Sequence, residues 1–140
     1  MLTRNGILLG AAVLLMAGCA GVPHTSRTGA IHDVKFGEHM MPSELQVQPG
    51  DEVRWVNHRT MPVRIDFLDG ALNEVSCERG FSNFIGRRQE SVSIDPNQSA
   101  SVCFSKSGAV TYNARMESAV PGGKVIEPGM IRVGPPLARQ

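Results

Sequence analysis

The sequence lacks the motifs and the charge that mark most enzymes and nucleic-acid-binding proteins. It has no Gly-rich phosphate loop, HExxH zinc motif, nucleophile elbow or CxxC pair. Its 14 basic side chains are nearly balanced by 13 acidic ones, for a formal net charge of +1. We therefore expect a protein that is not an enzyme, and the charge balance gives no electrostatic basis for a nucleic-acid partner.

The sequence also lacks an apolar run of the roughly 20 residues that a membrane-spanning helix needs. The apolar run at residues 7–16 is shorter, follows Arg4 and precedes two small residues and Cys19, which is the pattern of an export signal. The letters LMAGC resemble the lipobox of bacterial lipoproteins. This resemblance implies that residues 1–18 are a cleaved signal peptide and that Cys19 carries the lipid. An ordinary signal peptide with a chance cysteine is the alternative.

The same resemblance implies where the chain is attached. Ala20, rather than Asp, follows the lipidated cysteine, which favours the outer membrane over the inner one. We expect the protein to lie on the periplasmic side of that membrane, with the lipid as its membrane contact. Residues 19–30 combine the lipidated terminus with a flexible tether of small, polar and turn residues, and residues 136–140 form a C-terminal tail.

Cysteine is scarce, with three in the chain. If Cys19 carries lipid, Cys77 and Cys103 remain as a pair in an oxidising compartment, where we expect them to form a disulfide. The alternative is two buried free thiols. Their separation in sequence argues against a CxxC-type redox pair.

Beyond residue 30 the sequence has no apolar stripe of helical period that is ten residues long. Apolar and polar residues instead alternate over short runs that end at Gly, Pro or Asn turns. Val53 and Trp55 show the pattern well, since they share one face of the run DEVRWVN. Seven or eight short antiparallel strands predict an all-β sandwich, with runs at 31–36, 44–48, 51–57, 62–67, 91–94, 100–104, 109–113 and 130–133.

Residues 69–90 do not fit the strand pattern, because their apolar residues are sparse and their glycines frequent. We expect a long excursion between the sheets, with at most a short helix. Phe81, Phe84 and Ile85 lie beside the basic pair Arg87–Arg88. These apolar side chains form a docking surface, or one or two of the aromatics cover the core.

The stretch PSELQVQPGDEVRWVN at residues 42–57 resembles the cupredoxins, the blue-copper superfamily that includes plastocyanin. The resemblance continues at 61–65, 98–112 and 129–133. It implies that residues 31–135 form one cupredoxin-like domain, a Greek-key β-sandwich.

The resemblance also implies where a type 1 copper site would lie. Such a site takes one His after the third predicted strand, and then a Cys, a second His and usually a Met before the last strand. Val63 stands at the position of the first His, Ala114 near that of the thiolate, and Glu117 near that of the second His. We therefore expect no blue-copper centre and no bound cofactor.

A different copper site remains an alternative. The predicted strand directions bring residues 37–43 and 58–61 to one rim of the sandwich, and the resemblance adds residues 113–128. Imidazole and thioether groups suit Cu(I). The candidate ligands at this rim are His39, Met41, His58, Met61 and Met116. The competing interpretation is that the methionines fill gaps and the histidines face water.

Two functions follow from these observations. The first is a membrane-anchored periplasmic module without a blue-copper centre, which binds a periplasmic protein partner or supports it structurally. The second is a copper-binding or copper-handling protein with a His/Met site.

Overall fold

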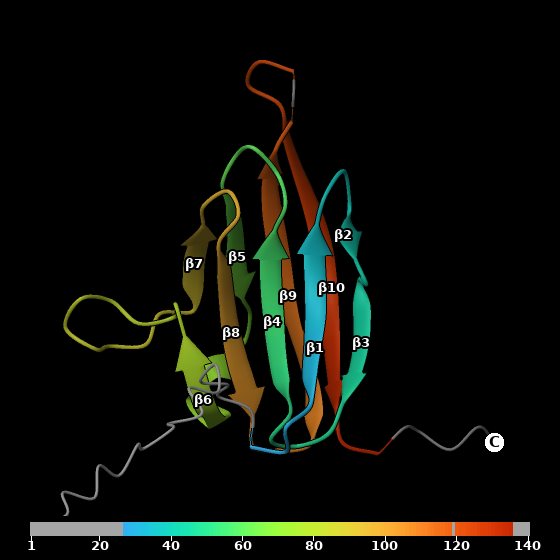
Figure 1. Cartoon of the computed structure of the whole chain (residues 1–140), viewed down its shortest axis with the longest axis vertical. Helices are drawn as coiled ribbons and strands as arrows, with labels where there is room; N and C mark the ends of the chain where they lie inside the picture. Colours follow the sequence, from blue (N-terminus) through green and yellow to red (C-terminus); the bar gives the residue numbers. More distant parts are fainter. Residues whose placement is uncertain (1–26, 119, 136–140) are drawn as a thin grey trace, which may run out of the picture.

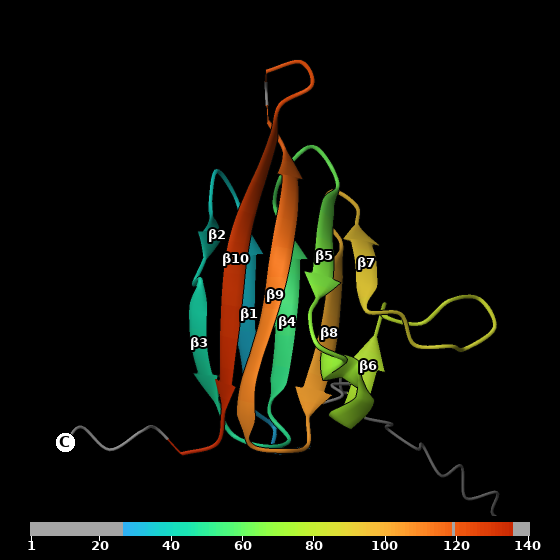
Figure 2. The ribbon, with the colours of Figure 1, turned by 180° about the vertical axis from the view of Figure 1, so that it is seen from behind.

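The computed structural model describes residues 27–118 and 120–135, so the predicted signal peptide, the lipidation site Cys19 and the C-terminal tail lie outside the described residues. Two five-stranded sheets face each other, one in front in Figure 1 and the other in front in Figure 2. The elements are β1 (Ile31–Phe36), β2 (Met40–Met41), β3 (Glu44–Val47), β4 (Glu52–Asn57), β5 (Val63–Phe67), the 3-10 helix η1 (Ala71–Glu74), β6 (Val75–Arg79), β7 (Ser91–Ile94), β8 (Ser99–Phe104), β9 (Gly108–Glu117) and β10 (Lys124–Val133).

The directions of two strand pairs differ from the sequence prediction. The first sheet runs β2-β1-β4-β8-β6 and the second runs β3-β10-β9-β5-β7. Most neighbours are antiparallel, as expected, but β1 pairs parallel with β4 and β3 pairs parallel with β10. Local alternation of apolar residues does not encode direction, which is why the sequence predicted antiparallel strands throughout. The predicted all-β sandwich itself is confirmed.

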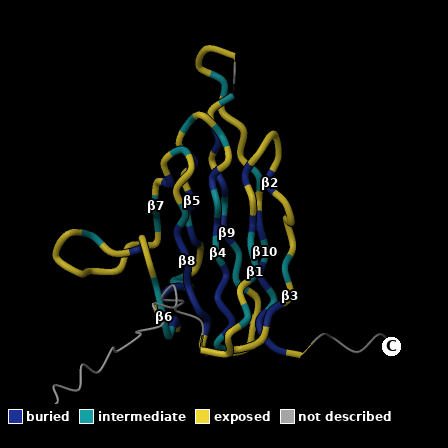
Figure 3. The backbone as a smooth tube through the Cα atoms, in the orientation of Figure 1, coloured by how far each residue is buried: buried dark blue, intermediate teal, exposed yellow. Residues whose placement is uncertain are grey.

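The core lies between the sheets and is centred on Trp55. Alternation along β4 directs Val53 and Trp55 inward, and both are fully buried. The Trp55 ring makes edge contacts with three aromatic rings, at centroid distances of 5.4 Å to Phe67, 5.7 Å to Phe81 and 5.5 Å to Tyr112. Figure 3 shows the buried positions running along the facing strands of both sheets. Edge-to-face packing of this kind stabilises the core beyond area burial alone.

The excursion predicted at residues 69–90 contains more structure than its composition indicated. The short helix expected there is η1, but β6 was missed, because the run VSCER carries a single large apolar residue. With β2 and β6 included, the described residues form ten strands rather than seven or eight. Among the described residues, no helix is long and apolar enough to cross a membrane.

The last two strands, β9 and β10, form a long hairpin. β9 and β10 pair over ten register positions, from Lys124 opposite Glu117 to Val133 opposite Gly108. The hairpin extends beyond the rest of the sandwich (Figure 1). Gly129 lies opposite Tyr112, and a Cβ at this position would lie 2.2 Å from the Tyr112 ring. Glycine at 129 therefore lets the Tyr112 ring pack inward against Trp55.

Candidate functional site

Three segments that are distant in sequence meet at one end of the sandwich; the strand directions predicted this for the first two, and the resemblance added the third. We call this end the rim, and define it as residues 37–41, residues 58–62 and the hairpin residues 116–127, of which residue 119 is not described. Figure 1 shows the three segments at the same end of the long axis. The amide of His58 donates to the carbonyl of Phe36 at 3.0 Å and so joins the first segment to the second.

Arg59 connects all three segments of the rim. Its guanidinium donates to the carbonyl of Gly37 at 2.9 Å and to the carbonyl of Glu117, and it lies 3.7 Å from the sulfur of Met116. The side chain is half-buried. Hydrogen bonds from a charged donor are stronger than neutral ones, so this one cation fixes the relative positions of the loops. Sequence reasoning missed Arg59, because no spacing rule distinguishes it from other loop arginines.

Asn57 holds the loop that carries Arg59. Its side chain is fully buried and donates to the carbonyls of Met61 at 2.9 Å and Ile94 at 2.8 Å. Its Oδ1 accepts from the amide of Arg59 at 2.9 Å. The amide group of Asn57 thus satisfies backbone groups on both sides of the loop, which is what a buried polar side chain requires.

His39 is paired with Glu127 on the hairpin. The two side chains approach to 2.9 Å between Nδ1 and Oε1, and the other carboxylate oxygen accepts from the amide of Met40 at 2.6 Å. The hydrogen bond and the charge of Glu127 raise the pKa of His39 above its ordinary value of 6.5. The hydrogen bond to the Glu127 carboxylate occupies Nδ1 of His39, so that nitrogen has no free lone pair for a metal.

The five predicted copper ligands lie in different environments. Met41 is 69% exposed on β2, whereas Met116 is 1% exposed within the core. His58 and Met61 line one shallow hollow, together with Gly37, Glu38, Arg59 and Thr60. In the described part of the chain, no three His, Cys, Asp or Glu side chains are grouped so that they could hold a metal ion.

Of the three positions that the cupredoxin resemblance assigned to copper ligands, two belong to the apolar core, whereas Glu117 is exposed at the end of β9. Val63 and Ala114 are fully buried. Val63 pairs with Met116, and Ile65 with Ala114, across β5 and β9. The apolar side chains at this end of the core therefore pack against one another directly below Arg59.

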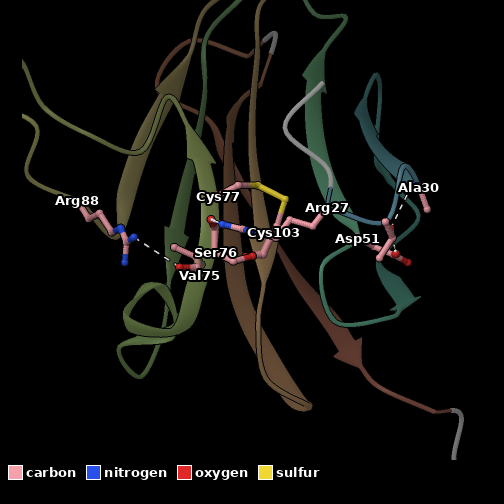
Figure 4. The surroundings of a disulfide bond; sticks show 9 residues. Arg27, Ala30, Asp51, Val75, Ser76, Cys77, Arg88 and Cys103 are labelled. Atoms are coloured by element: carbon pink, nitrogen blue, oxygen red, sulfur yellow. Dashed lines mark hydrogen bonds between the residues drawn. A yellow bond between two sulfur atoms is a disulfide. The ribbon is translucent and has the colours of Figure 1, made fainter. Parts of the chain in front are cut away.

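The predicted disulfide between Cys77 and Cys103 is confirmed. It links β6 to its neighbour β8, and the two Cα atoms lie 4.9 Å apart at directly opposed register positions (Figure 4). Arg27, the first described residue, donates to the carbonyl of Ser76 at 3.4 Å. The backbone amide of Arg27 donates to the carbonyl of Gly50 at 3.0 Å, so its side chain reaches β6 from the turn before β4.

Two exposed apolar regions lie outside the core. The first is on the rim and contains Met41, Val120, Val125 and Ile126, which are 69%, 68%, 43% and 51% exposed. The second lies within residues 69–90, where Phe84 is 98% exposed and Phe81 is buried, with 1% exposed. One of the two predicted aromatics therefore covers the core and the other faces outward.

Comparison with known proteins finds similar solved structures and no other match. No family model matches the chain, and no curated protein does. Similar solved structures include a Cu(I) form of an amicyanin mutant, at 23% identity and a TM-score of 0.47, which covers 75% of this chain and 82% of that one. A reduced amicyanin mutant matches at 23% identity and a TM-score of 0.48, over 76% of this chain and 83% of that one.

Proposed function

We propose that this chain is a lipid-anchored periplasmic module without a blue-copper centre, and that its rim binds a protein partner. It is not an enzyme in this proposal. The outer membrane holds it through a lipid on Cys19, and the β-sandwich supplies a rigid support for the rim.

The donor set argues against type 1 copper. That centre needs a thiolate, and both cysteines of the domain are bonded to each other. The Arg59 guanidinium at 3.7 Å from the Met116 sulfur places a positive charge beside a thioether that would otherwise face the loops. A metal cation at this place would meet a like charge, which disfavours binding.

The exposed apolar surface of the hairpin is the observation that carries the proposal. Val120, Val125 and Ile126 are exposed on the hairpin, the part of the chain that extends farthest along the long axis, and Val125 and Ile126 lie on its two opposite faces. The surface is pre-organised, because the ten-position ladder of β9 and β10 and the hydrogen bonds of Arg59 fix it. Exposed apolar patches with fixed geometry favour protein binding, because little freedom is lost on association.

Site-specific photo-crosslinking in intact cells tests this function. A photo-reactive residue at position 120 should give a discrete protein adduct, and the same residue at Lys106, at the opposite end of the sandwich, serves as the matched control. Ile126→Ser in the position-120 background should reduce the adduct severalfold. Equal adducts from both positions, or none from position 120, would contradict a partner at the rim.

Copper handling is the second candidate, and one observation favours it. His58 and Met61 line the same hollow, and an imidazole with a thioether is a suitable pair for Cu(I). Equimolar Cu(I) should then remain bound through gel filtration, and His58→Ala should release it. His39→Ala serves as a comparison, because His39 is paired with Glu127. If no copper is retained by the folded protein, this candidate is wrong.

A further inference from the structure

The loop at residues 80–90 presents an apolar tip. Phe84 is 98% exposed and Ile85 is 61% exposed. Figure 1 shows this loop projecting sideways from the edge of the sandwich at β6 and β7, and Figure 3 shows its outer part fully exposed. Two adjacent large apolar side chains at the end of a projecting loop are costly to leave in water.

Hydrogen bonds within the loop hold the tip in one shape. Oδ1 of Asn83 accepts from the amides of Ile85 at 3.1 Å and Arg87 at 2.9 Å, and the amide of Gly86 donates to the Asn83 carbonyl at 2.9 Å. Ser82 and Arg88 form a β-bridge at the base. The buried ring of Phe81 fixes this base in the core. The tip is therefore presented in a ready conformation and loses little freedom on binding.

The side chain of Arg27 reaches this edge from the turn before β4, where its backbone amide donates to the carbonyl of Gly50 at 3.0 Å. Arg27 contacts Ser76 on β6, and β6 leads directly into the loop (Figure 4). Cys19 lies eight residues before Arg27 in the sequence. Eight residues extend over at most about 28 Å. A lipid on Cys19 would therefore keep the bilayer within reach of the edge that carries the loop.

The charges near the tip are those that suit a lipid surface. Arg79 and Arg87 are exposed at the base and on the far side of the tip, and Arg88 donates to the carbonyls of Leu72 and Val75. Two acidic residues lie in the same region: the carboxylate of Glu78 accepts from the amide of Phe81 at 3.0 Å, and Glu90 is exposed at the end of the loop. An aromatic with neighbouring arginines favours the boundary between headgroups and acyl chains.

We propose that Phe84 and Ile85 insert into the bilayer that holds the lipid anchor, with Arg79 and Arg87 against its anionic headgroups. This inference rests on the proposed function, because it requires the anchor on Cys19. One lipid signal often binds a membrane reversibly, and a second contact makes attachment stable. The tip would also fix the orientation of the domain and leave the rim, at the far end of the long axis from β6, accessible to a partner.

Fluorescence of the full lipidated chain tests the insertion. The probe is NBD on a Phe84→Cys variant, reconstituted in vesicles of phosphatidylethanolamine and phosphatidylglycerol. If Cys19 is lipidated and Cys77 is bonded to Cys103, the introduced cysteine is the one free thiol. Val120→Cys on the rim provides the matched control, since Val120 is exposed as well. We expect a blue-shifted emission and severalfold weaker quenching by aqueous iodide at position 84, and an aqueous spectrum at position 120.

Each outcome is decisive. Co-flotation with vesicles together with an aqueous spectrum at position 84 would overturn the insertion while leaving the anchor intact. If the chain does not float with the vesicles, the anchor fails and the insertion fails with it. A photo-reactive residue at 84 that reacts with protein rather than lipid would also overturn the proposal. Arg87→Gln should lower the ratio of inserted to non-inserted tip about fivefold, because one basic residue contributes about this much to binding at an anionic surface.

Discussion

The two ends of the sandwich are held together by different forces. Near the tether, a disulfide joins β6 to β8, Arg27 binds Ser76, and the ring of Phe81 is inserted beside Trp55. We call this region the tether edge. The segments of the rim are instead held in place by the hydrogen bonds of Arg59, by the buried amide of Asn57, and by the pairing of the hairpin strands. The contacts that stabilise the tether edge are covalent and apolar, whereas those that join the rim segments are hydrogen bonds.

The difference shows which contacts stabilise the whole fold and which act locally. Apolar burial and a cross-link stabilise a domain by several kcal/mol, while individual polar contacts contribute about 1 kcal/mol each. Substitutions at the tether edge should therefore affect the whole fold. Substitutions at the rim should act locally, on the shape of the hairpin and its loops.

The largest effect is expected for Phe81→Ala at the tether edge. Removing this buried ring leaves a cavity beside Trp55 and Phe67, and should lower the free energy of unfolding by about 3–5 kcal/mol. Urea denaturation followed by Trp55 fluorescence measures the change. Phe84→Ala, three residues along the same loop, should alter stability by less than about 0.5 kcal/mol, since Phe84 is exposed. Similar losses for both variants would contradict the burial described for Phe81.

The next effect is expected for the double variant Cys77→Ala/Cys103→Ala. The disulfide closes a loop with a sequence separation of 26, and restricting such a loop in the unfolded chain stabilises the fold by about 3 kcal/mol. Chemical denaturation of the two proteins under oxidising conditions gives the difference. The wild type in the presence of a reductant should match the double variant, and a large residual difference would show that the alanines act by some other route.

At the rim, Arg59→Met should have a smaller effect. The substitution keeps much of the apolar stem but removes the donors to Gly37 and Glu117, at a cost of about 1–2 kcal/mol. Amide hydrogen exchange should accelerate in the hairpin and not in β6. Lys124→Met, on the same hairpin, should change stability by less than about 0.5 kcal/mol. Uniformly faster exchange across the domain would mean that the rim is not an independent unit.

The smallest effect concerns the pH response of the rim. Glu127 raises the pKa of His39, so the ion pair is complete below that pKa and is lost as the pH rises through it. Glu127→Gln should lower the pKa of His39 toward 6.5 and should leave global stability nearly unchanged, because His39 is exposed. NMR titration of the imidazole measures the shift. An unchanged pKa would show that Glu127 is not the partner in solution.

The sequence predicted most of this fold, because the strands that build the sandwich alternate clearly. β4 and β5 direct apolar residues inward at every second position, and their bounds agree with the predicted runs to within one residue. β6 could not be predicted in this way. Its stability comes from pairing with β8 and from the bond between Cys77 and Cys103, neither of which leaves an apolar period in the sequence.

The candidate site was predicted in part. Strand directions correctly placed two of the rim segments together, and the resemblance added the hairpin segment. The strand directions did not reveal that Met116 is buried. Met116 is followed by Glu117 and by further charged or small residues, a composition that is typical of a loop. Nor could the strand directions assign Arg59, whose importance depends on carbonyls supplied by two other segments. Contacts of this kind exist only after the tertiary structure has formed.

Arg59 has one further consequence for how the protein matures. A rim organised by a metal ion is complete only after the ion has been delivered, and its geometry depends on supply. Arg59 is synthesised with the chain, and its guanidinium carries a fixed positive charge. Its contacts with Gly37 and Glu117 therefore form in the same event as the fold. These contacts between the rim segments are thus complete as soon as the sandwich has folded.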